Sequence, residues 1–156
     1  MSDAPPPERS EPIVSDLVEY LIVVAPDQDA LGTVAPALVE LVESDTIRIL
    51  DLVVLARESD GADTVLEAPA IAGGADLARL DVTVGGMLTA HDVELAAMAL
   101  RPGTAGIVLV TEDRWAEPLS AAARRAGGRI VAGDRIPPAR VERVLAERFD
   151  EDGAGA

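Results

Sequence analysis

The alternation of apolar and polar residues along the chain predicts short strands separated by helices. Apolar runs rich in β-branched residues are typical of strands, and they occur at residues 17–25, 46–57, 106–111 and 130–132. Apolar residues spaced three and four apart are typical of helices, and they occur at residues 34–43, 90–100, 115–126 and 140–149. The strongest strand signal, 46–57, leads into the turn-forming pair Asp60-Gly61, after which residues 64–67 are expected to return as an antiparallel strand.

Two strand–helix–strand units emerge from this order, at residues 20–51 and 106–134, each with a proline near the start of its helix. Two such units in one sheet predict an α/β (α+β) fold, namely a ferredoxin-like split βαβ sandwich with an inserted hairpin strand and helix. We expect a single domain over residues 16–148, with residues 68–100 as the insertion. A disordered leader rich in proline and acidic residues (1–15) and a disordered tail (149–156) are expected to flank it.

The strands of this predicted sheet are apolar on both faces. Strict alternation along 46–57 assigns Ile47, Ile49, Asp51, Val53 and Leu55 to one face and Arg48, Leu50, Leu52, Val54 and Ala56 to the other. The crossover helices of a ferredoxin-like sheet cover only one face, so the second face needs another cover. Either helix 90–100 and the last helix supply it, or a second subunit does, and we hypothesise that association supplies at least part.

The charge of the chain excludes several classes of partner. There are 28 acidic residues and 13 basic ones, the latter all arginine, for a formal net charge of −15. Such a surface repels nucleic acid and anionic lipid. The chain has no cysteine, and no apolar run approaches the roughly 18 residues of a membrane span. We therefore expect a cytoplasmic protein with no membrane span and no nucleic-acid partner.

The sequence contains no recognisable catalytic, metal-binding or phosphate-binding motif. The one histidine, His91, falls in the first turn of a helix that the capping box Thr89–Asp92 predicts, where its ring is expected to face solvent. The acidic turns lack the spacing of a calcium loop, no Gly-x-Gly-x-x-Gly follows a strand, and the absence of lysine excludes a P-loop. The sequence predicts no catalytic residue, no cofactor and no metal ligand.

Two side chains are candidate interaction residues. Asp51 lies in the middle of an apolar strand, where a carboxylate faces a polar seam, caps the exposed amides of a neighbouring strand, pairs with an arginine across an interface, or lies at an exposed rim. Trp115 begins a helix directly after a strand. It is expected to anchor that helix to the sheet or to act as an interface hot spot, of which anchoring is the favoured interpretation.

Two stretches of the chain are similar to a known family. Residues 37–61, with Ile-Arg-Ile-Leu-Asp, and residues 115–137, with Arg-Ala-Gly-Gly, resemble small uncharacterised actinobacterial proteins. These look related to a wider domain-of-unknown-function family that carries a Gly-rich membrane hairpin. The resemblance covers residues 17–147 and implies no activity. The charged residues within 68–100 depart from the hairpin pattern.

These observations predict a small acidic module without enzymatic activity. We expect it to form a homo-oligomer or to bind a protein partner. The alternative is a small-molecule-binding protein or an enzyme, whose pocket would lie on the open sheet face or at a dimer seam and would use Asp51 and backbone amides.

Overall fold

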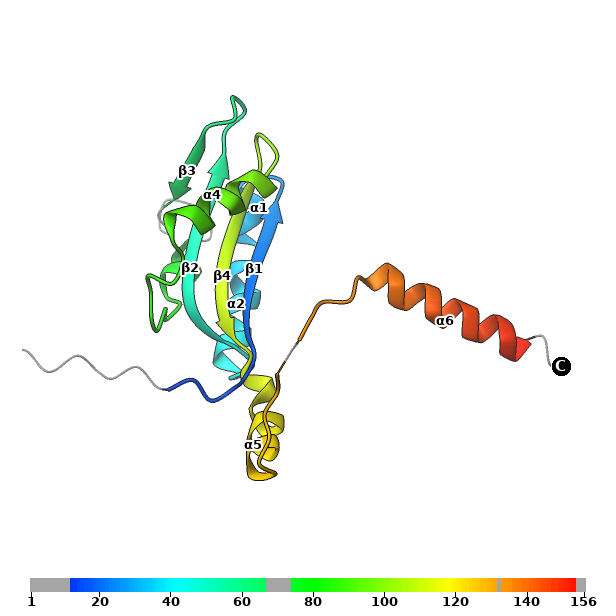
Figure 1. Ribbon diagram of the computed structural model, residues 1–156. Helices are drawn as coiled ribbons and strands as arrows, with labels where there is room; N and C mark the ends of the chain where they lie inside the picture. Colours follow the sequence, from blue (N-terminus) through cyan, green and yellow to red (C-terminus); the bar gives the residue numbers. More distant parts are fainter. Residues whose placement is uncertain (1–11, 67–73, 132, 154–156) are drawn as a thin grey trace, which may run out of the picture.

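A computed structural model describes residues 12–66, 74–131 and 133–153 of the chain (Figure 1). Its strands are β1 (Val18–Ala25), β2 (Arg48–Arg57), β3 (Asp63–Leu66) and β4 (Ala105–Glu112). Its helices are α1 (Gln28–Gly32), α2 (Ala35–Glu43), α3 (Gly74–Ala78), α4 (Ala90–Ala99), the 3-10 turn η2 (Arg114–Ala116), α5 (Glu117–Arg125) and α6 (Pro138–Gly153). The predicted strands 17–25, 46–57, 64–67 and 106–111 are therefore confirmed, apart from residue 67, which lies outside the described residues.

The strands form one open sheet in the order β1-β4-β2-β3, and every neighbouring pair is antiparallel. β1 and β2 consequently run in the same direction on either side of β4. The chain between them passes through α1 and α2, which makes β1-α1-α2-β2 a split βαβ unit. The fold is mixed α+β, with β1 and β3 at the two edges of the sheet (Figure 1).

A β-bulge in β2 overturns the face assignment that strict alternation predicts. Ile49 pairs with Thr111, but Asp51, not Leu50, pairs with Val110, so Leu50 is an extra residue in the strand. An extra residue reverses which side chains face each way beyond it. Ile49, Leu52 and Val54 consequently share one face, while Asp51 lies on the other.

Different helices cover the two faces of the sheet. On one face, here called the α1/α2 face, Ile49, Ile107 and Leu109 are buried with Leu31 of α1 and Leu38 of α2. The second face is here called the α4 face. Its core consists of Leu55 and Val108 packed against three residues of α4, Ala96, Ala97 and Leu100. Part of the cover that the second face needs therefore comes from the helix predicted at 90–100, while α6 stands apart from the sheet (Figure 1).

The helix starts follow from local hydrogen bonds, in one case differently from the sequence prediction. Thr33, which directly precedes the helix predicted at 34–43, ends a separate short helix α1, because the Asp27 side chain accepts a hydrogen bond from the Ala30 amide and begins a helix earlier. The capping box at Thr89 and Asp92 is confirmed, with both reciprocal hydrogen bonds present. Gly61 has a φ of 87°, as the tight turn between β2 and β3 requires.

The strand predicted at 130–132 does not form at the residues that are described. Ile130 and Val131 lie outside the sheet, and residue 132 lies outside the described residues. The Ile130 amide donates to a side-chain oxygen of Asp16, 3.4 Å away, rather than to a strand backbone. A piece this short, next to Gly127-Gly128 and Gly133, has too few ladder hydrogen bonds to stabilise a strand.

The segments expected to flank the domain are described only in part. Residues 1–11, 67–73 and 154–156 of the predicted leader, insertion and tail lie outside the described residues. In the rest of the leader, Ser15 is buried against the end of the sheet. Helix α6 extends to Gly153, into the predicted tail. Within the predicted insertion, α4 forms part of the core of the sheet.

Candidate interaction surface

An apolar strip on β1 lies open on the α4 face. Its residues Val18, Tyr20 and Val24 are 46–50% exposed, here called the β1 strip. They alternate with Leu21 and Val23, which pack partly buried against the α1/α2 core. Large apolar side chains on a face of a sheet are normally buried beneath a helix or another layer that covers that face. The strip therefore marks the part of the α4 face that α4 leaves uncovered.

Helix α4 borders this strip along one side. The Tyr20 hydroxyl lies 3.5 Å from the backbone oxygen of Asp92 and donates to it, which places the first turn of α4 beside β1. Partial burial and the nearby Asp92 carboxylate raise the pKa of the Tyr20 hydroxyl. The exposed apolar residues of α4, Leu95 and Met98, lie on the side of the helix away from its buried residues Ala96, Ala97 and Leu100, so they do not extend the strip.

A groove of about 520 Å³ adjoins the strip at the end of β1 where the strand begins. Val18, Tyr20 and Trp115 line it, together with the segment around Ile130 to Arg135. Arg135 of that segment pairs with Glu19 at 2.9 Å, and the Ile130 amide donates to Asp16. Asp16 in turn pairs with Arg124 at 3.2 Å. The groove combines two aromatic side chains with carboxylates, of which Glu19 and Asp16 have arginine partners.

Asp113 lies next to this groove, in the turn between β4 and η2. Burial raises the pKa of its carboxyl group, and the negative charge of Glu19 raises it further. The Arg135 guanidinium and a hydrogen bond from Trp115 act in the opposite direction on the same pKa. The backbone is fixed independently, since the Asp113 amide donates to the Leu17 carbonyl at 2.8 Å. The ionised form of Asp113 is therefore disfavoured in the folded chain.

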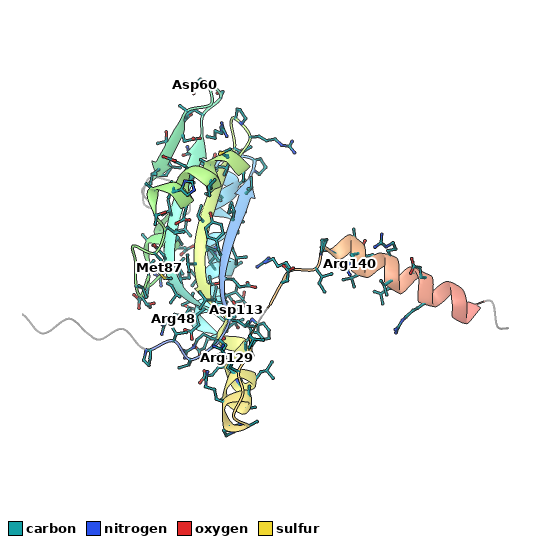
Figure 2. All side chains as sticks on the ribbon, in the orientation of Figure 1. Arg48, Asp60, Met87, Asp113, Arg129 and Arg140 are labelled. Carbon is teal, nitrogen blue, oxygen red and sulfur yellow. The ribbon has the colours of Figure 1, made fainter. Side chains whose placement is uncertain are left out.

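A buried carboxylate closes the same end of the sheet. Glu112 is fully buried on the α4 face, where it accepts hydrogen bonds from the amides of Val14 and Ser15 at 2.7 and 2.9 Å. The guanidinium of Arg48, its cross-strand neighbour, lies 3.3 Å away. Figure 2 shows Arg48 and Asp113 together at this end of the sheet. The ion pair thus binds residues 14–15 to the sheet and closes this end of the α4 face.

Asp51 is buried and makes its hydrogen bonds within the chain. It is 6% exposed, and its carboxylate accepts hydrogen bonds from the amides of Leu52 and Leu88 at 2.9 and 2.8 Å. The neighbouring loop also donates to β2, through the amides of Thr83 and Gly85. Among the roles that the sequence leaves open for Asp51, the capping of backbone amides agrees with these hydrogen bonds. The Leu88 amide that it caps belongs to a loop and not to a neighbouring strand. Asp51 fixes the segment that leads into α4.

Trp115 is exposed, contrary to the favoured interpretation that it anchors a helix in the core. Its side chain is 59% exposed and lines the groove, while its backbone amide donates to the Thr46 carbonyl. The helix is anchored instead by Ala116 and Ser120, which are fully buried. The alternative role of Trp115, as an interface hot spot, stays a prediction.

The sequence analysis did not identify the residues of the β1 strip as a site. It recognised β1 as apolar on both faces but had no means of deciding which face a helix covers. The alternate positions of Val18, Tyr20 and Val24 were the available signal. The charged residues around Asp113 come from three segments far apart in the sequence, and no motif connects them.

Within residues 12–66, 74–131 and 133–153, no three histidine, cysteine, aspartate or glutamate side chains gather where they could hold a metal ion. His91 is exposed in the first turn of α4. None of the helices in the described ranges has the length and apolar character needed to cross a membrane.

Comparison with known proteins gives one match. The model of a family of unknown function, DUF6325, matches residues 15–152. Neither the curated proteins nor the solved structures include a match to this chain.

Proposed function

Since the chain belongs to the DUF6325 family of unknown function, we propose its function from its own surfaces. It is a module without enzymatic activity that self-associates through the β1 strip. The observation that carries this proposal is the half-exposure of Val18, Tyr20 and Val24 on the α4 face of the edge strand β1. Contiguous apolar surface of this kind marks an interaction site more often than scattered exposed side chains do.

The two candidate interaction residues have different parts in this proposal. Trp115 lies in the groove at the beginning of the strip and contacts the second copy directly, as exposed aromatic residues at interfaces do. Asp51 acts indirectly, because its hydrogen bond to the Leu88 amide holds the segment that positions α4. Loss of Asp51 would therefore disturb one border of the strip.

Light scattering after size-exclusion chromatography, over a series of protein concentrations, tests self-association. We expect the mass to rise from that of one chain, 16.2 kDa, toward twice that value. Val24→Asp should shift the midpoint at least tenfold toward higher concentration, because a charge would have to be buried. Val65→Asp is the matched control, since Val65 is an exposed valine on the opposite edge strand. A mass of one chain throughout, or equal effects of the two variants, would contradict the proposal.

A second candidate function is supported by the groove itself. Its volume of about 520 Å³ and its mixture of Tyr20, Trp115 and charged side chains match the size and lining of small-molecule sites. In this alternative the chain binds a metabolite or acts on one. A screen of metabolites and metal ions by thermal shift tests it, with the fluorescence of Trp115, the single tryptophan, as a local probe. A ligand must raise the melting temperature and change this fluorescence to support the alternative.

The finer features expected from the sequence stay proposals. The order β1-β4-β2 supports a ferredoxin-like arrangement. A ferredoxin-like sheet consists of two split βαβ units, and its first three strands are arranged in this order when the fourth strand does not join the sheet. A single domain over residues 16–148, a cytoplasmic location, an actinobacterial origin and a relation to the family with the Gly-rich hairpin are likewise proposed. None of them is needed for self-association through the β1 strip.

A further inference from the structure

Helix α6 has an apolar side that the sheet and its helices, in the part of the chain that the structure describes, leave uncovered (Figure 1). Val141, Val144 and Leu145 are each about half exposed, and their spacing of three and four places them on one side. The helix stands clear of the sheet, as the position of Arg140 near its start shows (Figure 2). A lone helix of this length gains most of its stability from packing of its apolar side. Helix α6 therefore needs a surface to pack against.

The uncovered part of the α4 face has the dimensions of one helix. Strands lie about 4.8 Å apart, so one helix of about 10 Å diameter covers only half of a four-stranded sheet. α4 packs over β2 and β4 and reaches Ile22 of β1, whereas Val18, Tyr20 and Val24 on the same face of β1 remain about half exposed. α6 has 16 residues and β1 has 8, which correspond to about 24 and 27 Å. A helix of the length of α6 fits along the whole strip.

The chain leading into α6 directs the helix away from its own sheet. Arg135 is tied to Glu19 of β1 by the 2.9 Å ion pair, so the linker starts at the edge of the sheet. Ile136 and Pro137 each precede a proline, which restricts both to extended conformations. A stiff, extended linker favours delivery of the helix to a neighbouring molecule over a sharp return to the strip beside it.

Two arginines lie along the apolar side of α6, and one carboxylate lies beside the strip. Arg148 follows Val144 by four positions, so it lies on the same side of α6 as the apolar residues, and Arg140 precedes Val144 by four. Beside the strip, the side chain of Asp92 lies in the first turn of α4 next to Tyr20. Hydrogen bonds from Thr89 lower the pKa of the Asp92 carboxyl group and keep it ionised. If α6 packs on the strip, one of these arginines can therefore pair with the Asp92 carboxylate.

We propose that two copies of this chain exchange their C-terminal helices, each α6 packing its apolar side on the β1 strip of the other copy. This inference rests on the proposed self-association and names the segment that carries it. The exchange is reciprocal, so a dimer of this kind has two identical contacts and twofold symmetry. Val18, Tyr20 and Val24 on one copy then contact Val141, Val144 and Leu145 on the other.

The absence of cysteine from the chain makes disulfide trapping a direct test. Tyr20 and Leu145 lie near the middle of β1 and α6, so a pair of cysteines there meets whichever way the helix runs. Tyr20→Cys and Leu145→Cys are purified as separate variants, mixed at a concentration where the wild-type chain is dimeric, and oxidised. Tyr20→Cys mixed with Arg143→Cys is the matched control, because Arg143 lies on the side of α6 away from Leu145.

We expect a covalent dimer in the first mixture, at least tenfold more abundant than in the control mixture. A third sample, the double variant Tyr20→Cys/Leu145→Cys in one chain, separates the alternatives. A linked monomer from it, without a dimer from the mixture, means that α6 covers its own strip, which overturns the exchange. A wild-type dimer that yields no trapped product overturns the exchange and leaves self-association standing. Wild-type chain that remains monomeric overturns both.

Discussion

Strand β1 presents apolar residues to both faces of the sheet, and the two sets differ in burial. Leu21 and Val23 pack into the core beneath α1 and α2, whereas Val18 and Tyr20, on the α4 face, are 46% exposed. The residue types are equally apolar, so composition does not explain the difference. The number of covering helices explains it, because among the described residues the α4 face carries one helix, whereas α1, α2 and Leu77 of α3 cover the α1/α2 face. The exposure of an apolar side chain in this sheet therefore depends on whether a helix covers that part of the face.

The largest effect is expected where the α4 face is closed by the ion pair of Glu112. Glu112→Ala removes the buried carboxylate that pairs with Arg48, and it also removes the acceptor for the amides of Val14 and Ser15. We expect the free energy of unfolding to fall by about 4 kcal/mol, as for other broken buried pairs. Chemical denaturation measures it.

Asp76→Ala is the control for this prediction, because Asp76 pairs with Arg79 at the surface, 3.9 Å away. It should cost less than about 0.5 kcal/mol. If the two variants were equally stable, Glu112 would not be the group that closes this end of the α4 face.

The next prediction compares the loss of unfolding free energy when one apolar side chain is truncated on each face of the sheet. Leu109→Ala removes a fully buried residue of the α1/α2 core and should cost about 3 kcal/mol. Val24→Ala removes a half-exposed residue of the β1 strip and should cost less than about 1 kcal/mol. Both are measured by denaturation at a concentration where light scattering gives the mass of one chain. A cost for Val24→Ala as large as that for Leu109→Ala would contradict the difference between the faces.

Removal of Asp51 should weaken one border of the β1 strip. In Asp51→Ala the Leu88 amide loses its acceptor, and we expect a loss of about 2 kcal/mol in the free energy of unfolding. Faster hydrogen exchange at the Leu88 amide should accompany it. Asp81→Ala, at an exposed position near the same loop, should change neither quantity. Unchanged exchange at Leu88 would show that Asp51 does not hold this segment.

The smallest effect is a pH dependence at Asp113. Because its pKa is raised on folding, the folded chain binds this proton more tightly than the unfolded chain, so Asp113 lowers stability as pH rises above its ordinary pKa. Asp113→Asn removes this titration. The stability of the variant relative to wild type should therefore increase as pH rises from about 3.8 through the raised pKa, and then level off. Denaturation curves between pH 3.5 and 7 measure it, and a difference that falls with pH would contradict the assigned direction.

Sequence patterns predicted most of the fold but little of the surface. Local signals were sufficient for β1, the hairpin at Asp60-Gly61 and the capping box at Thr89, because each depends on neighbouring residues. The bulge at Leu50 could not be predicted, since it arises from pairing with β4, about 60 residues further along the chain. The exposure of Trp115 likewise depends on what packs over η2. Asp51 was recognised as unusual, but its Leu88 partner comes from a loop without a sequence signature.

The central claim is that the β1 strip is buried when two chains associate, and Tyr20, the single tyrosine, reports on it directly. Hydroxyl-radical labelling can be carried out at concentrations below and above the midpoint of the mass transition. The account predicts that the labelling rate of Tyr20 falls severalfold as the mass doubles, while that of His91, exposed in α4, changes little. A doubled mass with an unchanged rate at Tyr20 would place the interface elsewhere and contradict the account.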